Sequence, residues 1–167
     1  MTAEPAMREG GCACGAIRYR LTEEPLIVHA CHCRDCQRLT GAPFVLNLWI
    51  ERKHVLPSGV EPRIAQLEAG SGAGHDVAFC GTCSTALWSH YHAPPGDTLF
   101  VRGATLDEPD AYAPDVHIFT RSKLPWLALP EGARSFPAMY SDFAAVWPAD
   151  QLARFRRHVA EHKAAQG

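Results

Sequence analysis

The sequence lacks both a long hydrophobic run and an excess of basic charge. Its longest apolar stretch is far shorter than the roughly 20 residues that a membrane-spanning helix needs, and residues 1–10 contain no apolar core of a secretion signal. The 16 lysine and arginine residues are outnumbered by 18 aspartate and glutamate residues, which gives a formal net charge of -2. We therefore expect neither a membrane nor a nucleic acid as a partner, and we expect a cytoplasmic protein.

The composition also excludes a disordered chain. Of the 167 residues, 47% are hydrophobic and only 20% are charged. A chain of this length and composition can bury a core of its own. We expect a single globular domain in which residues 1–9 form a loose N-terminal tail.

Cysteine, by contrast, is abundant, and the number of cysteines is an odd number, seven. Seven cysteines in a chain with no visible export signal are more typical of metal ligands than of disulfides, because the cytosol is reducing. Sulfur atoms one or two residues apart can all lie about 2.3 Å from one thiophilic ion, for which zinc is the default. The cysteines form three clusters: Cys12 and Cys14; Cys31, Cys33 and Cys36; and Cys80 and Cys83.

The spacing divides the cysteines into a set of four and a set of three. The middle cluster lies within six residues and can chelate as a unit, so the outer two pairs are left to meet across a long separation in sequence. Four thiolates saturate a zinc ion, which then only holds the fold together, whereas three leave a position for water or substrate. The sequence therefore predicts two zinc ions per chain, one structural and one reactive, with the three-ligand site the weaker and partly empty one.

The charge of the three-cysteine site indicates thiol chemistry rather than hydrolysis. Zinc with three thiolates carries a net charge of about −1, so it is a weaker Lewis acid than zinc held by neutral imidazoles. A thiol that enters the fourth position would lose its proton and become a positioned thiolate. Arg34 and Arg38 can offset the negative charge or lie free on the surface, and the sequence leaves both interpretations open.

Alternating and β-prone segments predict a mainly β fold. The apolar run 44–50 indicates a strand that is covered on both faces, and residues 57–59 (PSG) indicate a turn. Residues 76–88 predict a hairpin bent around the last cysteine pair. Strands are expected at residues 16–21, 26–30, 44–50, 63–67 and 98–102.

The remaining segments differ in character. The loop 70–74 (GSGAG) favours a hairpin tip over a flap beside the substrate. The prolines of residues 109–137 leave little helix there, so this segment is expected to wrap over the sheet. The apolar face of a terminal helix can dock on the domain or mediate a homodimer. That helix is predicted at residues 149–163, where three apolar residues recur at helical spacing: Leu152, Phe155 and Val159.

Several ordered segments resemble one known family. They are residues 10–19 (GGCACGAIRY), residues 31–38 (CHCRDCQR) with 41–43 (GAP), and residues 79–83 (FCGTC). The later HIF, SK and PW segments at 117–119, 122–123 and 125–126 are similar to its closing segment. The family is that of the glutathione-dependent formaldehyde-activating enzymes, whose domain is shared with centromere protein V. The match covers about residues 10–137, with 138–167 as an extension of the same domain.

The resemblance implies a fold, two metal sites and an activity. The fold is an Mss4-like β-tent of stacked antiparallel sheets, here followed by the C-terminal helix. The sites are a structural zinc at the four-cysteine set and a more labile zinc at Cys31, Cys33 and Cys36. The activity is the condensation of formaldehyde with glutathione to S-(hydroxymethyl)glutathione, formally that of a carbon-sulfur lyase in reverse. Glutathione or another small thiol is the implied partner.

Several further residues are candidates for roles near these sites. His117, Lys123 and Trp126 belong to the similar closing segment and, with Arg34 and Arg38, are candidate substrate contacts. Ser84 departs from the family pattern, which has glycine at this position. Glycine suits a positive φ, so serine is expected to cost roughly 1 kcal/mol there without removing a ligand.

The histidines offer alternatives at the three-cysteine site. His32 lies between two expected ligands, so its ring is expected to point away from the metal. Any of His29, His90, His92 and His117 could supply a fourth ligand or carry a proton, although a lone histidine is more often an ordinary residue.

Two functions compete. The first is a zinc-dependent enzyme that forms or cleaves a carbon-sulfur bond between a small thiol and a small carbonyl compound. The alternative is a noncatalytic zinc-binding or interaction module in which a histidine closes the three-cysteine site. Redox catalysis at the last cysteine pair is disfavoured, because no thioredoxin-like pattern surrounds it. The open coordination position favours the enzyme.

Overall fold

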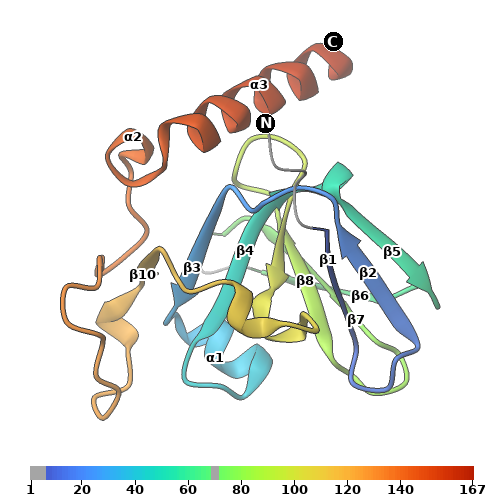
Figure 1. Ribbon diagram of the computed structural model, residues 1–167, viewed down its shortest axis with the longest axis horizontal. Helices are drawn as coiled ribbons and strands as arrows, with labels where there is room; N and C mark the ends of the chain where they lie inside the picture. The colour runs from blue at the N-terminus through green and yellow to red at the C-terminus, as the bar shows by residue number, and fades with distance from the viewer. Residues whose placement is uncertain (1–6, 69–71) are drawn as a thin grey trace.

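The described part of the chain folds into ten strands and three α-helices (Figure 1). The computed structural model describes residues 7–68 and 72–167. None of the helices in these ranges combines the length and the apolar composition that crossing a membrane requires. The helices are α1 (Arg34–Thr40), α2 (Phe143–Val146) and α3 (Ala149–Gln166). The strands are β1 (Arg8–Gly11), β2 (Ile17–Leu21), β3 (Ile27–Cys31), β4 (Val45–Glu51), β5 (Val55–Gly59), β6 (Arg63–Glu68), β7 (Gly74–Phe79), β8 (Ala86–Tyr91), β9 (Thr98–Arg102) and β10 (Val116–Ile118).

The strands form two sheets that lean against each other (Figure 1). The smaller sheet has the order β1-β2-β5, and the larger has the order β10-β3-β4-β9-β8-β7-β6. All strand pairs are antiparallel except β10 with β3, which is parallel. The mainly β, stacked-sheet fold with a C-terminal helix is confirmed, with one parallel pair that the sequence did not predict.

Both faces of β4, in the interior of the larger sheet, are buried, which explains its nearly continuous apolar run. Leu48 contributes to a core between the two sheets, where Tyr19 of β2 packs edge-on against Trp88 of β8. Trp49, the next residue, faces the opposite core, which is closed by the C-terminal part of the chain. Successive side chains of a strand point to opposite faces, so an apolar residue is required at nearly every position of β4.

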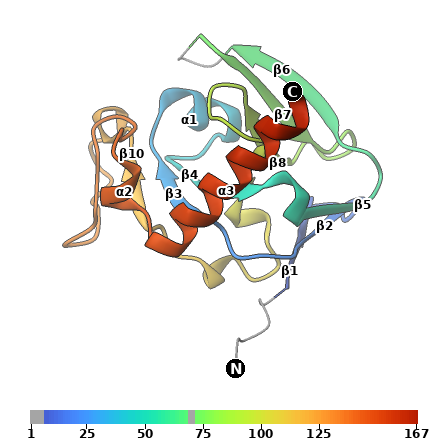
Figure 2. The same cartoon turned by 90° about the horizontal axis from the view of Figure 1, so that it is seen from above.

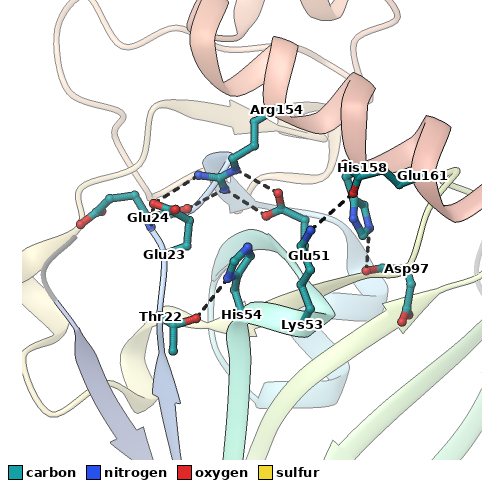
Figure 3. Close-up of polar contacts among 10 residues, drawn as sticks. All are labelled: Thr22, Glu23, Glu24, Glu51, Lys53, His54, Asp97, Arg154, His158 and Glu161. Carbon is teal, nitrogen blue, oxygen red and sulfur yellow. Dashed lines mark hydrogen bonds and ion pairs between the residues drawn. The ribbon is translucent and has the colours of Figure 1, made fainter. Parts of the chain in front are cut away.

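Helix α3 lies over the strands of the larger sheet (Figure 2) and docks there through apolar and ionic contacts, of which Figure 3 shows polar ones. Leu152 and Phe155 are buried in the core that contains Trp49. On the same helix, Arg154 binds the carboxylate of Glu51 with both Nε and Nη2, at 2.9 and 3.0 Å, and donates to the carbonyl of Glu24 at 2.7 Å. The predicted helix at 149–163 is confirmed, and its apolar face packs on its own domain.

Three details differ from the sequence-based predictions, and a fourth is only partly covered by the described residues. Arg8 and Glu9, expected in the tail, belong to β1, whereas residues 1–6 lie outside the described residues. Residues 57–59 form no turn but the end of β5, an edge strand in which proline loses no ladder hydrogen bond. Helices α1 and α2 were not predicted, because each is too short to show a helical period. The predicted hairpin tip at 70–74 lies partly outside the described residues.

Candidate metal centres

The outer two cysteine pairs meet where the two sheets touch. Cys12 and Cys14 lie in the connection from β1 to β2, and Cys80 and Cys83 lie between β7 and β8. The Sγ atoms of Cys12 and Cys14 are 3.5 Å apart, those of Cys14 and Cys80 are 3.7 Å apart, and all four lie within 4.8 Å of one another. Tetrahedral zinc with bonds of about 2.3 Å separates its sulfur ligands by about 3.8 Å. These residues therefore fit a zinc ion closely.

Backbone geometry around this set favours thiolates. The N–H groups of Ile17 and Thr82 donate to the sulfurs of Cys12 and Cys80, at 3.3 and 3.4 Å. The Thr85 hydroxyl contacts the Cys83 sulfur at 3.1 Å, and this hydrogen bond lowers the pKa of Cys83 to about 5.

Ser84 closes this turn in the left-handed backbone conformation. Its φ is 60°, and its N–H donates to the carbonyl of Cys80 at 2.9 Å. The positive φ that the sequence predicts for Ser84 is confirmed. Because the serine is exposed, no buried contact offsets the strain at this position.

The middle cysteine cluster lies where β3 ends and α1 begins. Cys31 is the last residue of β3, Cys33 is the N-cap of α1 and accepts a hydrogen bond from the backbone N–H of Cys36 at 3.3 Å, and Cys36 lies in the first turn. Gly41 ends the short helix with a φ of 66°. The three sulfurs lie within 4.8 Å of one another, and Cys31 and Cys36 are buried.

The three thiols influence one another strongly, which makes the set suitable for a cation. Hydrogen bonds from Cys31, and then from Cys36, lower the pKa of Cys33. The pKa of Cys31 is raised, first by its hydrogen bond with Cys33 and then by that with Cys36 and by burial. One thiolate is thus stabilised at the expense of the others. Only a cation bound among them allows all three to ionise, so the donor set fits zinc.

A cavity of about 590 Å³ opens beside this cluster. Cys31 and Cys33 lie in its wall, whereas Cys36 and the four cysteines of the other set do not. Large apolar side chains form much of the wall: Trp49, Tyr91, Phe100, Ile118, Phe119 and Met139. Six polar or charged side chains also lie in the wall: His29, Arg34, Asp35, Asn47, Arg121 and Ser122. The three-cysteine set therefore faces a space of ligand size, as an open metal site requires.

A buried guanidinium lies behind this wall. Arg102 is 3% exposed and donates to the neutral side chains of Asn47 and Ser89, while its Nε has no partner. The pKa of Cys36 is raised overall to about 11: its hydrogen bond with Cys31, the largest influence, lowers the pKa, but Cys33 and burial raise it. The charge of Arg102 acts in the lowering direction. Arg102 thus favours negative charge on the cluster.

The five candidate substrate contacts differ in their positions relative to the cavity. Arg34 lies in the cavity wall and donates to the Gln37 side chain at 2.6 Å. Arg38 is exposed in the last turn of α1 and is not part of the wall. Of the two arginines beside the cysteines, only Arg34 is placed to contact a molecule in the cavity.

The other three candidates also lie away from the cavity wall. His117 is buried, and its Nδ1 lies 3.0 Å from Nε2 of His32. Lys123 donates to the carbonyl of Leu127 at 2.5 Å, and Trp126 is 69% exposed. Their contacts in this structure are with neighbouring residues or solvent.

Sequence reasoning missed several residues of the cavity. Asn47 carried a signal, because it is the one polar residue in the apolar run 44–50. Phe119 carried none, although its φ of 57° is strained for an aromatic residue. Arg121 comes two residues later and faces the same cavity.

No histidine of the described ranges joins either cysteine set. His29 Nε2 lies 2.8 Å from the hydroxyl of Tyr140, and His32 points to His117, away from the sulfurs. The expectation for the His32 ring thus agrees with its position. The closed site of the alternative hypothesis has no histidine donor in this arrangement.

Comparison with known proteins assigns the chain to a family. The model of the family described as glutathione-dependent formaldehyde-activating enzyme matches residues 7–122. The chain belongs to this family. A relative in the glutathione-dependent formaldehyde-activating enzyme family, from Halomonas elongata, carries the name "Putative glutathione-dependent formaldehyde-activating enzyme" and is 27% identical over 148 residues, which are 84% of this chain and 94% of the relative. A crystal structure of a Rhodobacter sphaeroides protein is similar over 59% of this chain and 87% of its own, with 21% identity and a TM-score of 0.46.

Proposed function

We propose that the protein is a zinc-dependent enzyme of the carbon-sulfur lyase type. Its substrate is a thiol adduct of a small carbonyl compound, of the kind of S-(hydroxymethyl)glutathione. The observation that carries the proposal is that Cys31 and Cys33 of the triple lie in the wall of a cavity of about 590 Å³, with no histidine of the described residues in ligand reach. Membership of the family supplies the substrate class.

The two cysteine sets have different roles in this proposal. The set of Cys12, Cys14, Cys80 and Cys83 holds a structural zinc between the sheets, because four thiolates leave no position for a substrate. The triple holds the second zinc, which would supply a positive charge that favours the ionised form of an entering thiol.

The cavity residues bind and orient the substrate. Glutathione carries two carboxylates, and Arg34 and Arg121 are the cationic side chains of the wall that match them. The apolar wall, with Trp49 and Phe100, excludes water from the reacting atoms. The buried charge of Arg102 offsets part of the negative charge of the cysteines.

The reaction balances without an added oxidant or reductant. In the direction of synthesis, the thiol sulfur forms a bond to the carbon of formaldehyde, and the π electrons of the carbonyl group move to its oxygen. The proton that leaves the thiol ends on this oxygen, which becomes the hydroxyl of the adduct. Lysis is the same sequence in reverse, with cleavage of the carbon-sulfur bond.

Exchange NMR with labelled formaldehyde and glutathione tests this activity on the zinc-loaded protein. The protein should accelerate the interconversion of free formaldehyde and adduct, and Cys33→Ser should abolish the acceleration with loss of one zinc. Arg34→Gln should raise the KM for glutathione about tenfold or more, the loss expected for one hydrogen bond to a charged group. Arg38→Gln is the matched control, because Arg38 is exposed and outside the wall.

Three results would contradict the proposal. They are an exchange rate equal to that without protein, an unchanged rate in Cys33→Ser, and two zinc ions whose ligands do not respond to added thiol. X-ray absorption that shows three sulfurs and one nitrogen at the triple, unaffected by glutathione, would favour the noncatalytic module instead.

A further inference from the structure

A third group of potential metal ligands lies at the opposite end of the β7–β8 hairpin from the cysteines. Asp76 of β7 and His90 of β8 are paired directly across the two strands, and His92 follows His90 two residues later. Side chains two residues apart lie on the same face of a strand. The carboxylate and the two imidazoles therefore gather on one face, and their ligand atoms lie within 4.8 Å of one another.

The distances suit an ion between these three side chains. Nε2 of His92 lies 2.9 Å and Nδ1 of His90 lies 3.9 Å from the same carboxylate oxygen, Oδ2 of Asp76. Tetrahedral zinc with bonds of about 2.1 Å separates nitrogen and oxygen ligands by about 3.4 Å. The two observed distances bracket this value, so small side-chain movements would seat an ion.

Two further observations point to a ligand at this place. The second carboxylate oxygen of Asp76, Oδ1, is buried and has no hydrogen-bond partner. The His92 ring lies directly over Gly74, where a Cβ atom would come within 2.2 Å of its Nδ1. The glycine thus leaves the space that turns Nε2 of His92 toward Asp76.

We propose that Asp76, His90 and His92 form a zinc site that is separate from both cysteine sets. Two imidazoles and one carboxylate are a ligand set that zinc binds, with a fourth position left for water. The side chains are 25% exposed for Asp76, 26% for His90 and 44% for His92, so water can reach that position. The charge of Arg52 also acts on His90, and its ion pair with Asp97 at 2.6 Å offsets part of that charge.

The site would clamp the hairpin rather than serve the cavity. Tyr91, between the two histidines, points to the other face of β8 and lies in the cavity wall. Zinc at Asp76, His90 and His92 would therefore join β7 to β8 at the end opposite Cys80 and Cys83. This inference does not depend on the proposed function.

Zinc titration of the full chain, with its cysteine sites already loaded, tests the inference. Calorimetry should show one further equivalent of zinc for the wild type and for the control His54→Gln, whose histidine contacts Thr22 instead (Figure 3). His92→Gln and Asp76→Asn should bind this equivalent at least about tenfold more weakly. Equal binding in all four proteins, or no binding in the wild type beyond the cysteine sites, would overturn it.

A second measurement uses the wild type alone, so the test does not depend on whether the variants fold. In histidine-selective NMR, the added zinc should shift the imidazole resonances of His90 and His92 and leave those of His54 unchanged. Shifts confined to other histidines would also overturn the inference.

Discussion

The ion pair between α3 and the larger sheet gives a prediction with a defined magnitude (Figure 3). Glu51 is 1% exposed and shares two short contacts with Arg154, whose side chain is 18% exposed. Arg154→Leu leaves the Glu51 carboxylate buried without a cation, which costs about 3–5 kcal/mol in such sites. Water can approach the arginine side, so we expect the lower end, about 3 kcal/mol. For a domain of this size, this lowers Tm by about 6–12 °C.

The double variant isolates the charge from the packing. Glu51→Leu together with Arg154→Leu replaces the pair with apolar side chains, and we expect it to recover most of the loss, because such replacements are often neutral or stabilising. Urea unfolding, followed by tryptophan fluorescence at equal zinc content, measures both variants. Equal destabilisation by the single and the double variant, or a single-variant loss below about 1 kcal/mol, would refute the reasoning.

Two further predictions concern the cysteine sites. Ser84→Gly should raise the free energy of unfolding by up to about 1 kcal/mol, because it releases the left-handed strain. Thr82→Gly, in the same turn but without a positive φ, should lower the free energy of unfolding by about 0.5–1 kcal/mol. A thermal melt in which both variants change stability in the same direction contradicts the strain argument. Arg102→Met should weaken zinc binding at the triple about tenfold or more without affecting the four-cysteine set, and Arg102→Lys should recover part of the loss. Competition with a chromophoric chelator measures both affinities. Equal loss of zinc affinity at both sets would indicate a merely structural role for the guanidinium.

The sequence was most informative where chemistry is encoded by spacing. The division of the cysteines into four and three is the grouping in which the structure places them. Strand positions followed from periodicity, since β4 is covered on both faces as its nearly continuous apolar run predicts. Both features depend on residues that are close in sequence or repeat with a fixed period.

The cavity could not be predicted in this way, because its wall comes from distant segments. Trp49, Tyr91 and Phe119 lie on β4, on β8 and after β10, and no local pattern relates them. Arg102 is a similar case, since its burial depends on Asn47, a residue of a different strand. Helix α1 could not be predicted from the sequence either, because its N-cap is a cysteine side chain rather than one of the usual capping residues.

The order of the chain has a consequence for how the protein is made. All seven cysteines lie in the first 83 residues, but the wall that encloses the triple needs Ile118, Phe119, Arg121 and Met139. Synthesis proceeds from the N-terminus and early segments begin to fold first. The thiols of the triple therefore leave the ribosome before the residues that complete its cavity. Under the proposed function, zinc loading would thus begin at an exposed triple, whereas substrate binding would require the complete cavity.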